Sequence, residues 1–148
     1  MTAAGRLDIF RTWAPGFRAM MALDKAVSGG TLEHSLLELV RLRCSQHNGC
    51  DFCVDLHRRG ASAQGVSAEQ LEELARWPCS DRFDARARAG LALADALAHP
   101  GSGLPDALLA HAREVFTPAE LCQLFYAIAT IHAWNRLAIA DETPLPSG

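Results

Sequence analysis

Apolar side chains recur every three or four residues through most of the chain, which is the spacing of an α-helix that buries one face. The clearest case covers residues 32–47, where the apolar face holds Leu36, Leu37, Val40 and Cys44. The turn signal Asn48-Gly49 ends this helix. A second helix is predicted to begin near Cys50 and to continue to about residue 63.

Further helices are marked by capping residues and prolines. Ser67-x-x-Gln70 has the pattern of a capping box and opens a helix that Pro78 ends, and Ser80 or Asp81 is expected to cap the next one. Together with the two helices above, these signals predict helices over residues 13–27, 67–77, 80–98, 105–116 and 118–140.

The last predicted helix is apolar on all sides, which indicates burial in a core or an interface. Thr117 and Glu120 form a second capping box in front of it, and Pro118 stands at its first position. A membrane span is the rival interpretation, but polar residues interrupt the apolar run too often: Glu120, Gln123, His132, Asn135 and Arg136.

The remaining polar and sulfur-bearing residues have simple interpretations. His132 is expected to be a hydrogen-bonded residue of a core or interface, and Arg136 to bind an anionic substrate or form a buried salt bridge. Small, buried apolar residues are the simplest interpretation of Cys44, Cys79 and Cys122.

No alternating run of apolar and polar residues is long enough to predict a β-strand. The predicted fold class is therefore all-α, a single-domain helical bundle of about seven helices that spans residues 1–148. Its core covers about 15–140, and the tail over 141–148, which contains two prolines, is expected to be loose.

Composition narrows the function. Of the 148 residues, 49% are hydrophobic and 21% are charged, a balance that favours a homo-oligomer with buried interfaces. The net charge of −3 and the lack of a basic run argue against a nucleic-acid partner. An odd number of cysteines, five, does not suit a secreted disulfide framework, and residues 1–10 lack the apolar segment of a signal peptide. We therefore predict a cytoplasmic protein that does not bind membranes.

The chemistry of the chain is concentrated between Glu38 and His57. In a helix that begins near Cys50, Cys53 follows at i+3 and His57 lies four residues further, so the thiols and the imidazole share one face. The positive N-terminal end of a helix favours a thiolate, and histidine transfers protons near neutral pH. Glu38, on the preceding helix, can orient His57 or hold a water. The pattern predicts a redox-active dithiol with its own proton relay.

Three other interpretations of this cluster stay open. A Cys-x-x-Cys pair is also half of a zinc site, and the stretch contains enough donors for one: Cys44, His47, Cys50, Cys53 and His57. The rest of the chain offers no second ligand pair of matching spacing, so we expect no metal and no cofactor. A structural disulfide would close a loop too small to stabilise the fold much. Inert packing of Cys53 and His57 in a core is the third alternative.

The spacing Glu38-x11-Cys50-x2-Cys53-x3-His57 resembles the active-site motif of the AhpD-like alkylhydroperoxidases, within the carboxymuconolactone decarboxylase superfamily. The segment AIATIHAWNR, which ends at Arg136, is similar to a second recurring segment of that family. The resemblance covers nearly the whole chain and implies an AhpD-like helical fold that assembles into a trimer or hexamer.

The resemblance also implies a role for each residue of the motif. Cys53 is the peroxidatic cysteine, Cys50 is the resolving cysteine, and Glu38 and His57 form the proton relay that deprotonates Cys53. Helix geometry alone favours Cys50 as the more acidic thiol, because Cys50 lies nearer the N-terminus of its helix.

The implied activity is that of a thiol-dependent peroxidase that reduces organic hydroperoxides and is reset by a reductant protein or a dithiol. The chain departs from the family at Phe52, where some members carry a second histidine, and at His132, where asparagine is common. Two alternatives remain. One is a decarboxylase-type lyase, which needs a general acid and base but no dithiol, and the other is a non-enzymatic zinc or redox-sensing module.

Overall fold

The computed structural model describes residues 7–146, and within this range the chain is helical and contains no β-strand. The α-helices are α1 (Ile9–Thr12), α2 (Ala14–Ser28), α3 (His34–Asn48), α4 (Asp51–Ala63), α5 (Ala68–Glu73), α6 (Ala85–Ala98), α7 (Asp106–Val115) and α8 (Pro118–Asp141). Two short 3₁₀ helices join them, η1 (Leu74–Cys79) and η2 (Pro100–Ser102). The all-α prediction is confirmed.

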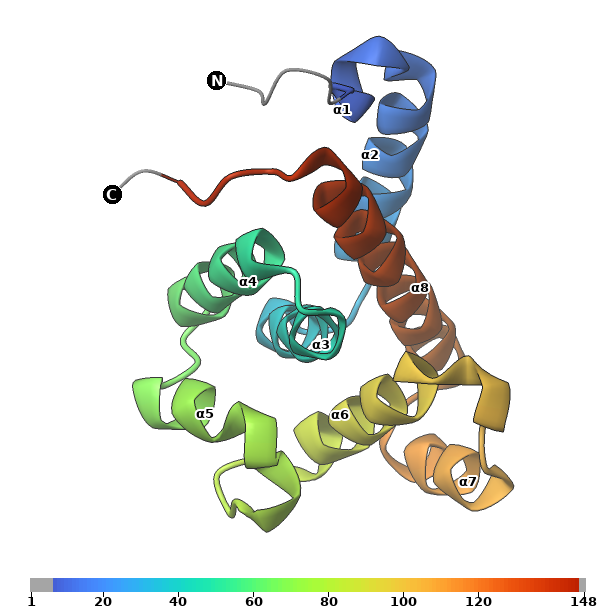
Figure 1. The fold of residues 1–148 in the computed structure, drawn as a ribbon. Helices are drawn as coiled ribbons and strands as arrows, with labels where there is room; N and C mark the ends of the chain where they lie inside the picture. Colours follow the sequence, from blue (N-terminus) through green and yellow to red (C-terminus); the bar gives the residue numbers. More distant parts are fainter. Residues whose placement is uncertain (1–6, 147–148) are drawn as a thin grey trace.

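Helix α3 lies at the centre of the fold, and α4, α6 and α8 pack around it (Figure 1). A helix in this position needs apolar residues on several faces, and α3 buries them at consecutive positions as well as at helical spacing: Leu36, Leu37, Leu39, Val40 and Leu42. Because α3 carries the first residue of the predicted motif and ends just before the cysteines, the centre of the fold also positions the site.

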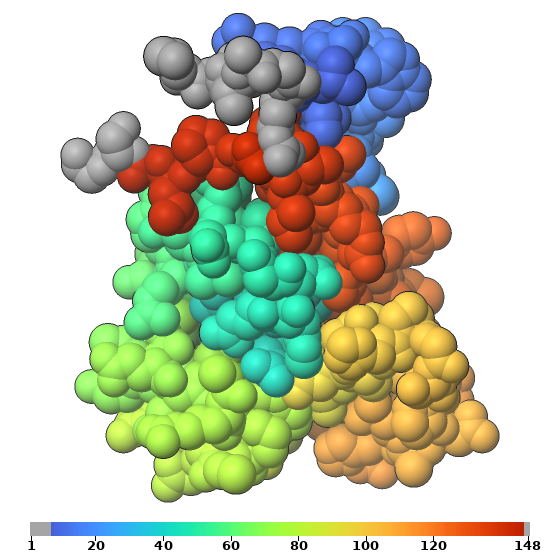
Figure 2. Space-filling model, in the orientation of Figure 1, coloured from blue at the N-terminus to red at the C-terminus, as the bar shows by residue number. Residues whose placement is uncertain are grey.

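The two ends of the described chain meet near the end of α8. The backbone N–H of Ile9, in α1, donates a hydrogen bond of 3.0 Å to Oδ1 of Asp141, the last residue of α8. In Figure 2 the C-terminal segment, in red, lies beside the teal surface formed by the end of α3 and the beginning of α4. Asp141 is thus the point where the last helix ends and the tail begins. That the tail is loose remains a prediction.

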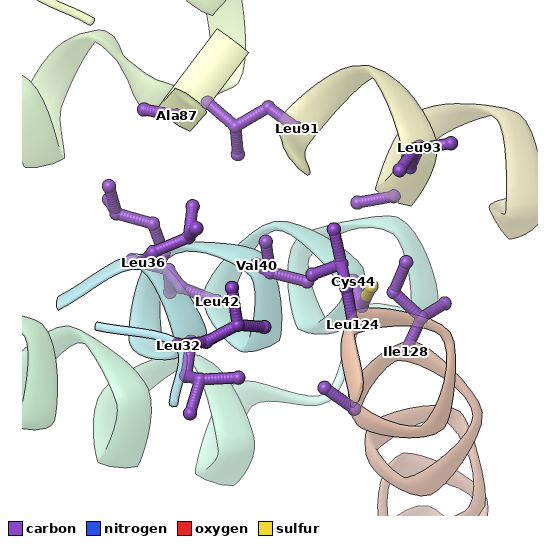
Figure 3. Close-up of a cluster of buried hydrophobic side chains, with 14 of the residues drawn as sticks. Leu32, Leu36, Val40, Leu42, Cys44, Ala87, Leu91, Leu93, Leu124 and Ile128 are labelled. Carbon is purple, nitrogen blue, oxygen red and sulfur yellow. The ribbon is translucent and has the colours of Figure 1, made fainter. Parts of the chain in front are cut away.

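The hydrophobic core forms where α3 meets α6 and α8. Figure 3 shows Val40 and Cys44 of α3 between Leu91, from α6, and Leu124 and Ile128, from α8. Each of these side chains is at most 2% exposed. Burial of one such aliphatic side chain stabilises a fold by about 1.5–3 kcal/mol, so this contact is a major source of stability.

Helix α8 begins and ends close to the predicted positions. The hydroxyl of Thr117 accepts the N–H of Glu120 at 3.2 Å, and the Glu120 carboxylate accepts the N–H of Thr117 at 2.8 Å, which confirms the capping box. No helix between residues 7 and 146 combines the length and the apolarity that a membrane crossing requires.

The start of α6 differs from the prediction. Its N-cap is Asp84, whose carboxylate accepts the N–H of the third helical residue at 2.8 Å, so Ser80 and Asp81 lie before the helix. Ser80 instead belongs to a bend of the chain, where its hydroxyl donates to the carboxylate of Glu73 and accepts the N–H of Arg82 at 3.2 Å. The hydroxyl thus binds an N–H that lies before the helix, and Asp84 takes the N-cap position.

The end of α5 also differs from the prediction. The α-helical hydrogen bonding stops at Glu73 instead of Trp77, and the chain continues in η1. Arg76 leaves helical backbone angles, with φ of −121°, directly before Trp77 and Pro78. Pro78 itself lies inside η1, so the helical segment runs one residue past the proline that was expected to end it.

The cysteines outside the motif have two different environments. Cys44 is fully buried in the core, as predicted, but Cys79 and Cys122 are exposed, so their predicted burial is wrong. Cys122 lies on the outward side of α8, one helical turn from Tyr126, whose side chain is also exposed.

Candidate active site

The two motif cysteines lie at the turn between α3 and α4. Gly49 ends α3 with φ of 64°, a left-handed conformation that glycine adopts without strain. Cys50 is the N-cap of α4, and its sulfur accepts the backbone N–H of Cys53 at 3.3 Å. The two cysteines are joined in a disulfide, and their exposed fractions are only 3% and 4%. The predicted helix–turn–helix arrangement of the motif is confirmed.

A hydrogen bond between Glu38 and His57 joins the middle of α3 to the middle of α4. The Nδ1 atom of His57 lies 2.8 Å from Oε2 of Glu38, and both side chains are largely buried. Because a carboxylate only accepts hydrogen bonds, Nδ1 carries a proton and donates it, which leaves Nε2 of the neutral ring able to accept another. This is the tautomer and orientation that a general base requires.

Arg41 is a second partner of Glu38, and the sequence interpretation missed it. Its Nη1 atom lies 2.9 Å from Oε1 of Glu38, while Nη2 contacts Asp24 at 3.3 Å and donates to the Ser28 hydroxyl at 2.9 Å. Burial raises the pKa of Glu38, but the hydrogen bond from His57 and the charges of His57 and Arg41 outweigh it, so the pKa lies below its ordinary value. Glu38 is therefore a carboxylate at neutral pH.

Gly60 is the position on α4 that makes room for this carboxylate. A Cβ atom at Gly60 would collide with Oε2 of Glu38, the oxygen that His57 contacts. A glycine inside a helix is unfavourable compared with alanine, so the close approach of the two helices explains its presence. The sequence carried a signal for it, a single glycine three residues after His57 in an otherwise regular helix.

An apolar cavity of about 390 Å³ opens beside Cys53 and His57, and it is called the aromatic cavity below. Phe10, Phe17 and Trp134 form part of its wall, with ring centroids 5.6 to 6.1 Å apart. Such an enclosure accommodates the apolar body of a small organic molecule and brings it to the sulfur and the imidazole. The sequence interpretation did not identify this wall, because α1, α2 and α8 contribute its rings from distant parts of the chain.

His132 belongs to a polar cluster on the α8 side of the turn. The side-chain amide of Asn48 donates to Nδ1 of His132 at 2.7 Å and to the side-chain carbonyl of Asn135 at 2.9 Å. Asn135 in turn donates to the Ser45 hydroxyl at 3.0 Å. Burial, and then the nearby charge of Arg136, lowers the pKa of His132. The cluster fixes the residue that precedes Gly49, and His132 is a hydrogen-bonded internal residue, as predicted.

Arg136 forms no buried salt bridge with any residue between 7 and 146. Its side chain is exposed, and Nη1 donates to the carbonyl oxygen of His132, one turn earlier in α8, at 2.9 Å. A contact with an anionic substrate or with another subunit remains a prediction.

The two remaining donors of the motif stretch point away from the cysteines. His47 contacts Asp95 at 2.7 Å, and Asp95 also accepts hydrogen bonds from Arg43 and Trp77. Burial raises the pKa of Cys44 to about 12, so this thiol stays protonated at neutral pH. Within residues 7–146, no three His, Cys, Asp or Glu side chains converge in a way that could hold a metal ion.

Comparison with known proteins places the chain in a family. The model of the carboxymuconolactone decarboxylase family matches residues 14–96, and the chain therefore belongs to that family. The uncharacterized protein YdfG of Bacillus subtilis (strain 168) is 29% identical over 136 residues, which cover 91% of this chain and 92% of YdfG.

Solved structures agree on the fold. A protein of unknown function from Agrobacterium tumefaciens, described as a candidate antioxidant defence protein AhpD, is 31% identical with a TM-score of 0.92, over 97% of this chain and 99% of that one. The debrominase Bmp8, solved with 2,3,4-tribromopyrrole in one variant, is 18% identical with a TM-score of 0.78, over 87% of this chain and 70% of that one. At that identity Bmp8 shares the fold alone. The predicted AhpD-like fold is confirmed.

We expect Gly60→Ala to destabilise the protein. The added methyl group collides with the Glu38 carboxylate, and the resulting shift should cost about 1–3 kcal/mol despite the better helix propensity of alanine. Urea unfolding followed by circular dichroism measures the loss. The control is Ser62→Ala, an exposed position of the same helix, which should change stability by less than about 0.5 kcal/mol. A Gly60→Ala protein as stable as the wild type would contradict this account of the α3–α4 contact.

Stability should also depend on pH through Glu38. Because the folded-state pKa of Glu38 is depressed, its contribution is present above the ordinary carboxyl pKa and is lost as the pH falls through the folded-state value. Glu38→Gln should therefore destabilise the protein by about 1–3 kcal/mol at neutral pH, because its partners lose a charged acceptor. The difference between wild type and variant should shrink below about pH 4. Unfolding free energies measured from pH 3 to 7 test this, and a gap that widens in acid would count against it.

Proposed function

We propose that this protein is a thiol-dependent peroxidase that reduces organic hydroperoxides through a Cys50–Cys53 dithiol/disulfide cycle. The observation that carries the proposal is the Glu38–His57 hydrogen bond beside Cys53, at the wall of the aromatic cavity. A nucleophile, an oriented base and an enclosure for an apolar substrate thus lie together. Membership of a superfamily that contains AhpD-like proteins supports the same activity.

The first half of the cycle consumes the hydroperoxide. In the reduced protein, Nε2 of His57 accepts the thiol proton of Cys53, and Glu38 stabilises the imidazolium that forms. The Cys53 thiolate attacks the terminal oxygen of the hydroperoxide, and the O–O bond breaks. The alkoxide that leaves takes a proton from His57 and departs as an alcohol, while Cys53 becomes a sulfenic acid.

The second half forms the disulfide that the structure contains. The thiolate of Cys50 attacks the sulfur of the Cys53 sulfenic acid, the S–O bond breaks, and hydroxide leaves as water after protonation. The N-cap position of Cys50 supports this role, because the Cys53 N–H and the positive end of α4 stabilise a thiolate there. A reductant then restores both thiols, and the cytoplasm, where such reductants are abundant, remains the predicted location.

The cavity indicates which hydroperoxides react fastest. Its wall is mainly aromatic and aliphatic, and Asp24 and His57 are the acidic and basic side chains that line it. An aryl or alkyl hydroperoxide such as cumene hydroperoxide gains from burial there, at about 25 cal/mol per Å² of apolar surface, whereas hydrogen peroxide gains nothing. We therefore assign organic hydroperoxides as the substrate class.

Single substitutions separate the roles of the two cysteines. Cys50→Ser should react once with cumene hydroperoxide and stop as a sulfenic acid on Cys53, and Cys53→Ser should not react at a comparable rate. His57→Ala and Glu38→Gln should each slow the reaction by about 10²–10⁴-fold, with a smaller loss at high pH, where thiolate forms without a base. Stopped-flow consumption of the hydroperoxide and mass spectrometry of dimedone-trapped protein measure these effects.

Two other cysteines of the chain provide control variants, and three results would contradict the proposal. Cys79→Ser and Cys122→Ser remove exposed thiols outside the site and should react as the wild type does. A sulfenic acid on Cys50 of the Cys53→Ser protein, formed at the wild-type rate, would reverse the assignment of the two cysteines. No loss of thiols with any hydroperoxide would favour the lyase, and about one zinc per chain, lost on chelation together with the fold, would favour the zinc module.

The proposal includes self-association into a trimer or hexamer. Large aromatic and apolar side chains are exposed at the α1–α2 junction, on α2 and on α8, with exposed fractions of 69% for Trp13, 48% for Met21 and 60% for Tyr126. Light scattering at micromolar protein should give a multiple of the 16.0 kDa chain mass, and Trp13→Glu together with Tyr126→Glu should lower it. A wild-type mass of one chain would refute the assembly.

A further inference from the structure

The two cysteines of the disulfide line different hollows of the molecule. Cys53 lines the aromatic cavity, and Cys50 does not. Cys50 instead lines a second hollow of about 290 Å³, which does not include Cys53 and is called the C-terminal hollow below. Phe52, Ala138 and Thr143 contribute to both, so they form the partition between them.

The walls of the C-terminal hollow come from the start of α4 and the end of α8. Asp51 follows Cys50 on one side, and Ile139, Glu142 and Leu145 form the other. These are the segments that lie next to each other in Figure 2, where the red C-terminal segment borders the teal surface. This hollow carries the carboxylates of Asp51 and Glu142, whereas Asp24 is the acidic side chain that lines the aromatic cavity.

A defined turn holds the C-terminal wall in place. Glu142 has φ of 51°, and this left-handed residue reverses the chain after α8. The N–H of Glu142 donates to the carbonyl of Ile139 at 3.2 Å, and the N–H of Thr143 donates to that of Ala138 at 3.0 Å, the two bonds of a Schellman motif. The hydroxyl of Thr143 also donates to Asp141 at 3.2 Å. The wall is therefore part of the fold as far as Thr143.

We infer that the reductant attacks Cys50 through the C-terminal hollow, so that oxidant and reductant reach the dithiol from different sides. This inference rests on the proposed peroxidase cycle and names its second reactant as a dithiol without negative charge near its sulfurs. The aromatic cavity does not suit a reducing thiolate, because a charged sulfur would lose its hydration there. The carboxylate of Asp51, next to Cys50 in the wall of the C-terminal hollow, repels anionic thiols and leaves neutral or cationic ones unhindered.

The exchange balances without a further reactant. A thiolate of the reductant attacks the sulfur of Cys50, the S–S bond breaks, and its electron pair leaves on Cys53, which is protonated. The second thiol of the reductant loses its proton and attacks the reductant's own sulfur in the mixed disulfide. Cys50 leaves as a thiolate, and the reductant departs as a disulfide.

Mapping of the first adduct tests the inference directly. The disulfide is formed with diamide instead of a hydroperoxide, in protein carrying Cys79→Ser and Cys122→Ser, so the result does not depend on peroxidase activity. Brief treatment with cysteamine, a cationic monothiol, is followed by N-ethylmaleimide and tandem mass spectrometry. We expect cysteamine on Cys50 and the maleimide on Cys53, and the reverse pattern would overturn the inference. If hydroperoxide fails to oxidise the dithiol, the proposed function fails, but this mapping still decides the direction of attack.

Charge at Leu145 provides a second test. Leu145 is 55% exposed and lines only the C-terminal hollow, so substitutions there should leave the fold and the hydroperoxide step intact. Leu145→Glu should slow reduction of the disulfide by glutathione, an anionic thiol, and Leu145→Lys should accelerate it, each by roughly two- to tenfold at low salt. The matched pair Leu56→Glu and Leu56→Lys, in the wall of the aromatic cavity, should change the hydroperoxide step instead. Equal reduction rates for the two Leu145 variants would contradict the proposed route.

Discussion

A buried carboxylate is costly unless charged and hydrogen-bonding partners surround it, and the arrangement around Glu38 follows from this constraint. Arg41 contacts one oxygen of Glu38 and His57 the other, while Asp24 is a second carboxylate on the Arg41 guanidinium. Gly60 lets α4 approach closely enough for the contact. The crossing of α3 and α4, and with it the position of the dithiol, thus depends on satisfying one carboxylate.

The local features of the fold were predictable because short-range interactions determine them. The capping box at Thr117 and the glycine turn at Gly49 depend on residues within four positions of each other, and both are confirmed. The start of α6 was not predictable in this way. Ser80 is a good N-cap by residue type, but its hydroxyl joins the Glu73 carboxylate to the N–H of Arg82 in a bend of the chain, and Asp84 caps the helix instead. Competition of this kind is visible only in the folded molecule.

In the candidate site, too, the features that depend on local spacing were predictable and those that depend on tertiary contacts were not. The four motif residues could be placed on two adjacent helices from their spacing, and the structure brings Glu38 and His57 into contact. The spacing of the motif does not indicate which other side chains surround these four residues. The rings of Phe10 and Trp134 meet across more than a hundred positions. The exposure of Cys122 depends on which side of α8 faces the core, and a helix apolar on all sides does not reveal this.

The contact between the two ends of the chain has a consequence for the order of assembly. Ile9 and Asp141 are 132 positions apart, and their hydrogen bond holds α1 against the last turn of α8. Phe10, next to Ile9, supplies part of the cavity wall. During synthesis, α3 and α4 leave the ribosome early and can form the dithiol turn, but the wall beside it closes only after α8 is complete. Until then the cysteines of a nascent chain are not enclosed by the aromatic cavity. They can react with molecules that the completed cavity would exclude.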